Sequence, residues 1–290
     1  MVNEIIHHFK EKRNGVFLDC TIGNGGHTLK LLETLNGQCS IVGLDQDAEA
    51  LTRATDNLKL FQDRVVLRHI NFTSLDTVLD ELHITHIDAC LFDIGVSMNQ
   101  LYDAQRGFSF SGEGPLDMRM DARSETTAAT IVNTYREEEL NRILREYGEE
   151  YRARQIVRAI IKARAQNVIS TTTELAELVK KVYRDKRHRR THPATKTFQA
   201  LRIAVNNELD NLKNALNKVV HYVTGDGLIC VITFHSLEDR IVKQTFRAWA
   251  DEGIVSLLTK KPLQPSQEEM VRNPRARSAK MRIAKRSLHR

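Results

Sequence analysis

Short apolar runs alternate with amphipathic segments through the first hundred residues, and this alternation constrains the fold more than any other feature of the chain. The apolar runs lie at 16–20, 41–44, 65–67 and 87–92, with helical periodicity between them. Strands that alternate with helices form a mainly parallel sheet covered on both faces. The expected fold class is therefore α/β.

The alternation stops near residue 106, where a segment rich in Gly, Ser and Asp begins. Only helical periodicity follows, and apolar residues recur at steps of three and four, as one core-facing stripe requires: Phe198, Leu201, Val205, Leu209, Leu212, Leu216 and Val219. Strand character returns at 228–234. We expect an all-helical domain (106–221) inserted into an α/β domain made of 1–105 and 222–290.

A glycine turn, LDCTIGNGGHT at 18–28, follows the first apolar run and opens the next helix. Glycines let a ligand approach the backbone closely, and a helix N-terminus offers free N–H groups. Asp45 ends the second run, where a carboxylate can accept hydrogen bonds from ribose hydroxyls. The NAD fingerprint needs a third glycine three residues after Gly25, but Thr28 stands there. These residues indicate a nucleoside-containing cofactor and leave NAD and S-adenosylmethionine open.

Two further polar positions follow predicted strands. Asp93 ends the fourth run, at the edge where ligands of open α/β sheets bind. It could contact a cofactor, receive a proton from a substrate amine, or cap the next helix. After the fifth strand, His235 lies in the polar run FHSLEDR, in which Ser236 is a candidate helix cap. Asp93, or a backbone carbonyl near it, is the first candidate for a catalytic group, and His235 is the second.

Several other chemistries lack their motifs. The sequence has no Gly-Lys-Ser/Thr loop and no Gly-x-Ser-x-Gly elbow, so phosphoryl transfer and the usual hydrolase site are not expected. His83 and His86 lack further ligands nearby, and the four cysteines form no Cys-x-x-Cys pair, which predicts no metal and free thiols. No apolar run reaches the roughly 18 to 20 residues of a membrane span, and the start lacks a signal-peptide core. We expect a cytoplasmic protein with no membrane contact.

Positive charge is concentrated in two segments. Residues 271–290 carry eight basic side chains and no acidic one, and 184–190 carry five in seven positions, in a chain of net charge +6. Clustered basic groups release counterions when they meet phosphate, which favours a nucleic-acid partner. A solvated tail and a solvated loop are the alternative.

Longer motifs stand in a fixed order along residues 15–290: DCTIGNGGHT, RGFSFSGEGPLDMRMD, YGEE, HPATKTFQALRIAVNNEL, FHSLEDRIVK and NPRARSAKMR. In these motifs the chain resembles the ribosomal RNA small subunit methyltransferase H family, also called MraW. The resemblance implies a class I, Rossmann-like methyltransferase that uses S-adenosylmethionine to methylate the N4 amine of a decoding-centre cytosine in 16S rRNA. The implied partner is small-subunit rRNA or the assembled small subunit.

The resemblance also implies the cofactor contacts: Gly25, Gly26, His27, Asp45, Phe72, Asp93 and Gln100. One departure lies beside them, because the family's Ser-Ser-x-Gln-Leu-Asp reads SMNQLY at 97–102. An exposed target base would favour an aromatic clamp such as Phe108 or Phe110, although both could equally be core residues.

Two other functions stay open at this point. An NAD-dependent oxidoreductase would share the turn and Asp45, but it does not explain the basic tail. A non-catalytic ribosome-assembly factor would keep the fold and bind RNA without turnover. A monomer and a homodimer also both stay open.

Overall fold

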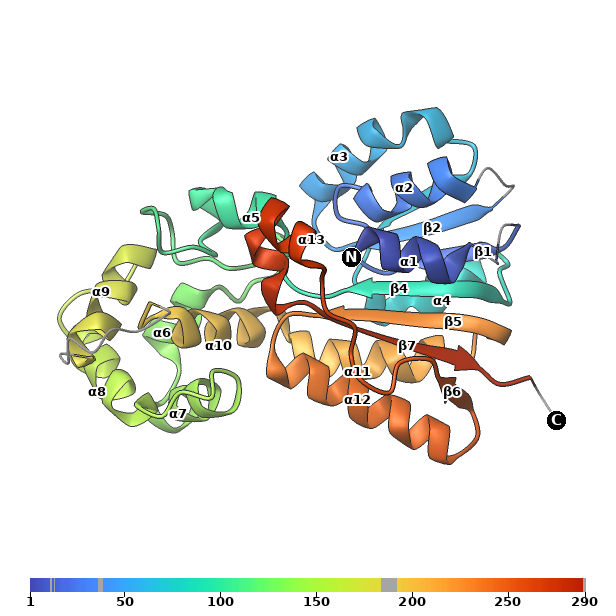
Figure 1. Ribbon diagram of the computed structural model, residues 1–290. Helices are drawn as coiled ribbons and strands as arrows, with labels where there is room; N and C mark the ends of the chain where they lie inside the picture. Colours follow the sequence, from blue (N-terminus) through green and yellow to red (C-terminus); the bar gives the residue numbers. More distant parts are fainter. Residues whose placement is uncertain (11, 13, 36–38, 184–191, 289–290) are drawn as a thin grey trace. The chain divides into compact units, whose positions relative to one another are not determined.

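The computed structural model describes residues 1–10, 12, 14–35, 39–183 and 192–288. The chain divides into two compact units (Figure 1). The first unit combines residues 1–95 with 209–290, and the second unit is the segment 96–208 between them.

The first unit is built on a sheet of seven strands among the described residues, in the order β3-β2-β1-β4-β5-β7-β6. The strands are β1 (Val16–Asp19), β2 (Ser40–Asp45), β3 (Val65–His69), β4 (Ile87–Asp93), β5 (Val223–Thr233), β6 (Val255–Leu257) and β7 (Lys280–Arg286). Strands β1 to β5 pair in parallel, while β7 is antiparallel to both of its neighbours. The expected mainly parallel α/β sheet is confirmed.

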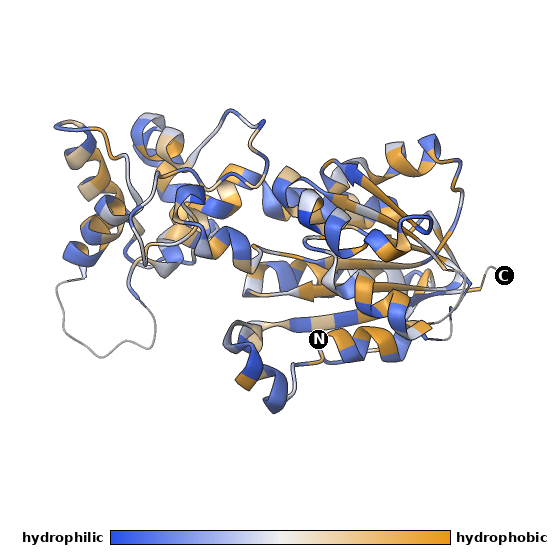
Figure 2. Cartoon of the chain, turned by 90° about the horizontal axis from the view of Figure 1, so that it is seen from above, coloured by the Kyte–Doolittle hydropathy of each residue, from blue (hydrophilic) through white to orange (hydrophobic). Residues whose placement is uncertain are grey.

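Helices cover both faces of this sheet (Figure 1). One face carries α1 (Val2–Phe9), α2 (Gly26–Leu35) and α3 (Ala48–Asn57), and the other carries α4 (Leu75–Glu81), α11 (Glu208–Val219) and α12 (Ser236–Asp251). Strand β4 shows why its apolar run is continuous: Ala89 and Leu91 enter one core, while Cys90 and Phe92 enter the other. Figure 2 shows these strands as hydrophobic bands.

The second unit is helical and has a hydrophobic core of its own. Its helices are α5 (Met98–Tyr102), α6 (Ala128–Thr134), α7 (Glu137–Glu146), α8 (Ala153–Arg164), α9 (Thr172–Val182) and α10 (Thr195–Asn206). Phe108 is buried in this core, and the Phe110 ring stacks on His192 with centroids 4.5 Å apart. Both aromatics are therefore packing residues and not an exposed clamp. Nowhere in the described ranges is a helix long and apolar enough to cross a membrane.

The apolar stripe from Phe198 to Val219 is two helices and not one. Asn207 has φ 49, a left-handed conformation that asparagine tolerates better than most residues, and it ends α10. Leu201 then packs in the core of the second unit, whereas Leu216 packs in the core of the first. Contacts therefore assign 96–208 to the insertion, in place of the expected 106–221, because α11 covers the sheet.

Candidate active site

The carboxyl ends of the parallel strands bring the expected glycine turn and three aspartates to one edge of the first unit. Strands β1, β2 and β4 end at Asp19, Asp45 and Asp93, and the turn joins β1 to α2. Gly23 and Gly25 have φ of 53 and 79, and a Cβ on Gly25 would lie 2.9 Å from a Leu58 methyl carbon. A side chain at Gly25 would therefore be strained by the backbone conformation and would also push the Leu58 side chain aside.

Gly26 begins α2, and a Cβ built on it would meet no atom within 4 Å. The backbone N–H groups of a first helical turn have no partner within their own helix. The space at Gly26 therefore lies beside groups that favour a negatively charged or hydrogen-bond-accepting ligand.

Asp45 ties the turn to the end of β2. Its Oδ2 accepts the Gly23 N–H at 2.9 Å, and its Oδ1 accepts the Asp47 N–H at 2.9 Å. Burial raises the pKa of this carboxyl, although the backbone N–H bonds oppose the rise. The carboxylate is thus fixed in orientation before any ligand arrives.

His27 and Asp93 form a pair across the edge. The His27 Nε2 lies 3.1 Å from the Asp93 Oδ2, and the Asp93 N–H donates to the Thr21 hydroxyl oxygen at 2.6 Å. Burial opposes the charged imidazole, but the hydrogen bond and charge of Asp93, with the charge of Asp19, raise the pKa of His27 overall. Two buried atoms of this pair, His27 Nδ1 and Asp93 Oδ1, have no hydrogen-bond partner among the described residues.

Asp19 is a buried carboxyl that the sequence reasoning did not single out. Its Oδ2 accepts the Thr28 hydroxyl at 2.8 Å, and its Oδ1 accepts the Thr21 N–H at 3.2 Å. Burial raises the pKa of Asp19 to about 6, against the lowering effect of His27. Its place directly before the glycine turn was a usable signal, but its burial was not visible in the sequence.

Phe72 lies just after β3 and packs edge-on against Phe92, with ring centroids 5.8 Å apart. Asn71 donates to the Gln46 side chain at 2.6 Å, which joins this segment to the residue after β2. Phe72 therefore lies in the same unit as the turn and Asp45. Gln100 belongs to the second unit, where its Oε1 accepts the Ser97 N–H at 2.9 Å in the cap of α5.

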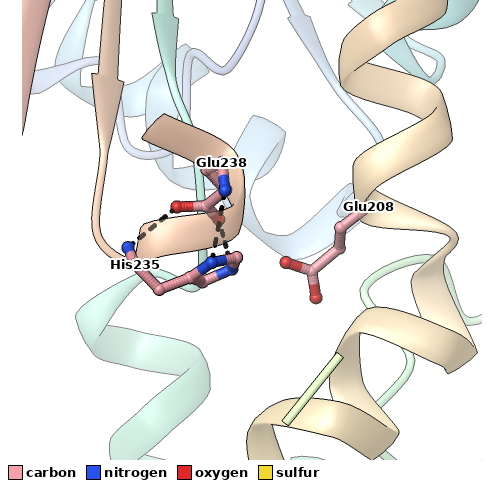
Figure 3. Close-up of side chains that lie close together, drawn as sticks. All are labelled: Glu208, His235 and Glu238. Atoms are coloured by element: carbon pink, nitrogen blue, oxygen red, sulfur yellow. Dashed lines mark hydrogen bonds and ion pairs between the residues drawn. The ribbon is translucent and has the colours of Figure 1, made fainter. Parts of the chain in front are cut away.

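His235 caps α12 (Figure 3). Its Nδ1 accepts the Glu238 N–H at 3.4 Å, and the Glu238 carboxylate accepts the N–H groups of Phe234 at 2.8 Å and His235 at 3.2 Å. The His235 Nε2 lies 2.9 Å from the Glu238 Oε1. The ring is thus engaged in a capping box, whose signal was the glutamate three residues after the cap.

Glu208, also drawn in Figure 3, forms an ion pair with Arg202. Both of its carboxylate oxygens accept from the Arg202 guanidinium, at 2.8 Å each. This buried bidentate pair fixes the end of the second unit beside Asn207.

The expected basic tail is partly a strand inside the sheet, because β7 lies between β5 and β6. Arg282 is buried and pairs with Asp239 of α12 at 2.7 Å, and Lys285 pairs with Asp226 at 2.8 Å. Arg272 and Arg277 remain exposed. The second basic segment, 184–190, lies outside the described residues.

Comparison with known proteins identifies the chain's relatives. A model of the MraW methylase family matches residues 1–287. The Ribosomal RNA small subunit methyltransferase H of Kosmotoga olearia is 47% identical over 289 residues, which covers 99% of this chain and 96% of that protein. The protein of the same name from Halothermothrix orenii is 42% identical over 305 residues, covering 100% and 98%.

One solved structure is similar to this chain in fold, at low sequence identity. A Clostridium thermocellum protein assigned as an rRNA-methylase is 13% identical, with a TM-score of 0.50 and coverage of 98% of this chain and 96% of that one. The family match begins at the first residue, so it also includes α1, which the sequence motifs did not reach. By the family model and by close relatives over its whole length, the chain belongs to the MraW methylase family.

Proposed function

We propose that this protein transfers the methyl group of S-adenosylmethionine to the N4 amine of a decoding-centre cytosine in small-subunit ribosomal RNA. The names of its relatives support an rRNA substrate, and membership of a methylase family sets aside the NAD-dependent oxidoreductase. The observation that carries the chemistry is the Asp93 carboxylate. One of its oxygens is held by His27, and the other is buried with no hydrogen-bond partner in the part of the chain that the structure describes. Such a substrate would place the protein in the cytoplasm.

The residues at the sheet edge fit S-adenosylmethionine. The space beside Gly26 and the N-terminus of α2 suits the carboxylate of its amino-acid part. Asp45, at the end of β2, suits the ribose hydroxyls, and Phe72 offers an aromatic surface for the adenine. Gln100 stays a predicted contact from the second unit. When bound, the cofactor supplies an electrophilic methyl group on its sulfonium.

Asp93 is the residue we assign to the substrate amine. The lone pair of a cytosine N4 amine is delocalised into the ring, so the amine must be held in line with the methyl group, and it loses a proton. His27 fixes Oδ2 of Asp93, and we assign Oδ1 to accept the amine N–H, which requires that substrate binding opens the surroundings of this buried oxygen. His235 is the weaker candidate because its ring takes part in the cap of α12.

Methyl transfer to RNA tests this function directly. The protein is incubated with methyl-labelled S-adenosylmethionine and either free 16S rRNA or small subunits from cells that lack the gene. We expect label in the RNA, and mass spectrometry of nuclease fragments should find one methyl group on a cytosine N4. A protein that binds RNA and leaves it unlabelled is the non-catalytic assembly factor, and our proposal is then wrong.

Asp93→Asn should lower kcat by about 10²- to 10⁴-fold, the usual contribution of a positioned proton acceptor. Because Asp93 is also a predicted cofactor contact, the cofactor affinity of this variant is measured separately by calorimetry. The matched variant is His235→Asn, since asparagine is a good N-cap and keeps α12 in place. We expect it to retain most of the activity. If His235→Asn lowers kcat more than Asp93→Asn does, His235 is the group that contacts the substrate amine and Asp93 is not.

A further inference from the structure

A groove opens on the second unit, directly after the YGEE motif at 147–150, and none of the predicted site residues lines it. Its volume is about 670 Å³, and α8, the turn before it and α9 provide the lining. Tyr151 and Gln155 are four residues apart and share one side of this segment, while Leu178, Lys181 and Val182 share one side of α9. Both walls belong to one compact unit with its own core.

Tyr151 presents an aromatic surface to solvent at the mouth of this groove, because 67% of it is exposed. Its position is nevertheless fixed. The buried Tyr183 meets it edge-on with ring centroids 5.9 Å apart, and the Tyr183 hydroxyl is anchored on buried Glu150. An exposed aromatic ring held this way is ready to stack on a planar ligand without further ordering.

Positive charge surrounds the ring. The Arg152 guanidinium lies 5.6 Å from the Tyr151 centroid and 4.7 Å from the Tyr183 centroid, and it donates to the Val182 carbonyl at 2.8 Å. Lys181 is exposed on the opposite wall, and Glu177, one turn before it, pairs with Lys180 at 2.8 Å. Among the described residues, none that lines the groove carries a carboxylate.

We propose that this groove binds an unpaired nucleotide of the RNA substrate, with the base stacked on Tyr151 and a flanking phosphate near Lys181 and Arg152. The proposal rests on the proposed function and adds a second contact to it. An aromatic ring beside basic groups is the general device for binding single strands, because every base has a face to stack. A duplex keeps its bases stacked inside and cannot use the ring. An acidic peptide matches the charge but leaves the ring without a planar partner.

Binding of a fluorescein-labelled single-stranded 16S rRNA fragment to the full chain tests the groove. Loss of a stack of 1–3 kcal/mol predicts that Tyr151→Ala weakens binding on the order of 5- to 150-fold, while Tyr151→Phe, which keeps the ring, binds like the parent. Lys181→Ala should also weaken binding and reduce the salt dependence by about one phosphate contact. The control is Arg145→Ala, which removes an exposed charge from α7 of the same unit but does not line the groove.

Three results would overturn the proposal: parent-like affinity in Tyr151→Ala, equal affinity of the parent for the same sequence as a duplex, or tighter binding of polyglutamate. Cofactor affinity and circular dichroism should stay unchanged in each variant, which separates a groove defect from misfolding. The two proposals fail in different ways. A parent protein that never methylates RNA contradicts the proposed function, whereas a Tyr151→Ala variant that binds RNA normally beside an active parent contradicts only the groove.

Discussion

At the scale of single residues, the two carboxylate oxygens of Asp45 stabilise the glycine turn, and the same oxygens are proposed to bind the ribose of the cofactor. Each oxygen accepts one backbone N–H, from Gly23 and from Asp47, so the carboxylate holds the glycine turn in shape. A carboxylate oxygen has further lone pairs, and these are what a ribose would use. Substitution at this position therefore affects the turn as well as the ligand.

Asp45→Ala should abolish S-adenosylmethionine binding in calorimetry while the fold persists. The free energy of unfolding should fall by about 1–3 kcal/mol for each backbone N–H that stays buried without an acceptor. Asp45→Asn keeps one acceptor oxygen and should give an intermediate affinity. Unchanged affinity in Asp45→Ala would reject the pocket, provided that circular dichroism confirms a folded protein.

Asp19 predicts a pH dependence of stability. Its pKa is raised from 3.8 to about 6 in the folded chain, so the folded state holds this proton where the unfolded state has lost it. Stability from this group is greatest below pH 3.8 and falls as the pH rises to about 6. In the cofactor-free protein, Asp19→Asn should remove that loss, which approaches ~3 kcal/mol at pH 7.

Denaturant unfolding of the parent and of Asp19→Asn between pH 4.5 and 7 measures this difference. Asparagine can still accept the Thr21 N–H and meet the Thr28 hydroxyl, so the comparison isolates the charge. Exposed Asp56 on α3 provides the control, Asp56→Asn, whose curve should run parallel to the parent. If the stability of Asp19→Asn also changes with pH in parallel to the parent, the folded and unfolded states bind the Asp19 proton equally, and the prediction is wrong.

Spacing along the chain was enough to find the glycine turn, Asp45 and Asp93, because parallel strands bring their carboxyl ends to one edge. It did not find the contacts made across that edge, such as His27 with Asp93 and Thr28 with Asp19. These depend on side-chain positions in three dimensions, which residue order does not specify.

At the scale of elements, β7 shows that one segment can be both a basic tail and a strand, as the apolar positions at 281–284 indicate. Its sequence KMRIAKR is mostly basic, yet Met281 and Ile283 lie in the core on one face while Arg282 pairs with Asp239 on the other. The strand therefore keeps its period of two although more than half of its residues are charged. The break at Asn207 was not predicted, because the apolar stripe stays in phase across the two helices that this residue separates.

The tail supports a sharper RNA-binding experiment than removal of 273–290, which would also take out β7. A double variant, Arg272→Ala with Arg277→Ala, removes two exposed charges and leaves the strand in place. We expect weaker RNA binding and a salt dependence lower by about one to two phosphate contacts. Arg282→Ala is the contrasting variant. It should lower the melting temperature, because the largely buried Asp239 then keeps only the more distant Lys280, at 3.5 Å, of its two cations among the described residues. An unchanged salt dependence in the double variant would remove the tail from the RNA interface.

At the scale of the whole molecule, the helical unit is an insertion into a sheet that holds every strand-edge residue of the site. Each unit has its own hydrophobic core. Removal of the second unit therefore tests whether the first unit folds without it. A chain with 97–207 replaced by a flexible glycine–serine linker should unfold cooperatively and still bind S-adenosylmethionine, with reduced affinity if Gln100 contacts it. It should lose RNA methylation. Complete loss of cofactor binding in a folded variant would show that the second unit supplies an essential part of the pocket.

The place of β7 also bears on how the protein is made. The strand is synthesised after the other six, yet it lies between β5 and β6 and provides the only ladder partner of β6 among the described residues. Until it leaves the ribosome, β5 is an open sheet edge and β6 has nowhere to dock, although the strands that carry Asp19, Asp45 and Asp93 have all emerged. A nascent chain could therefore assemble the cofactor edge early and stay prone to aggregation until its final strand closes the sheet.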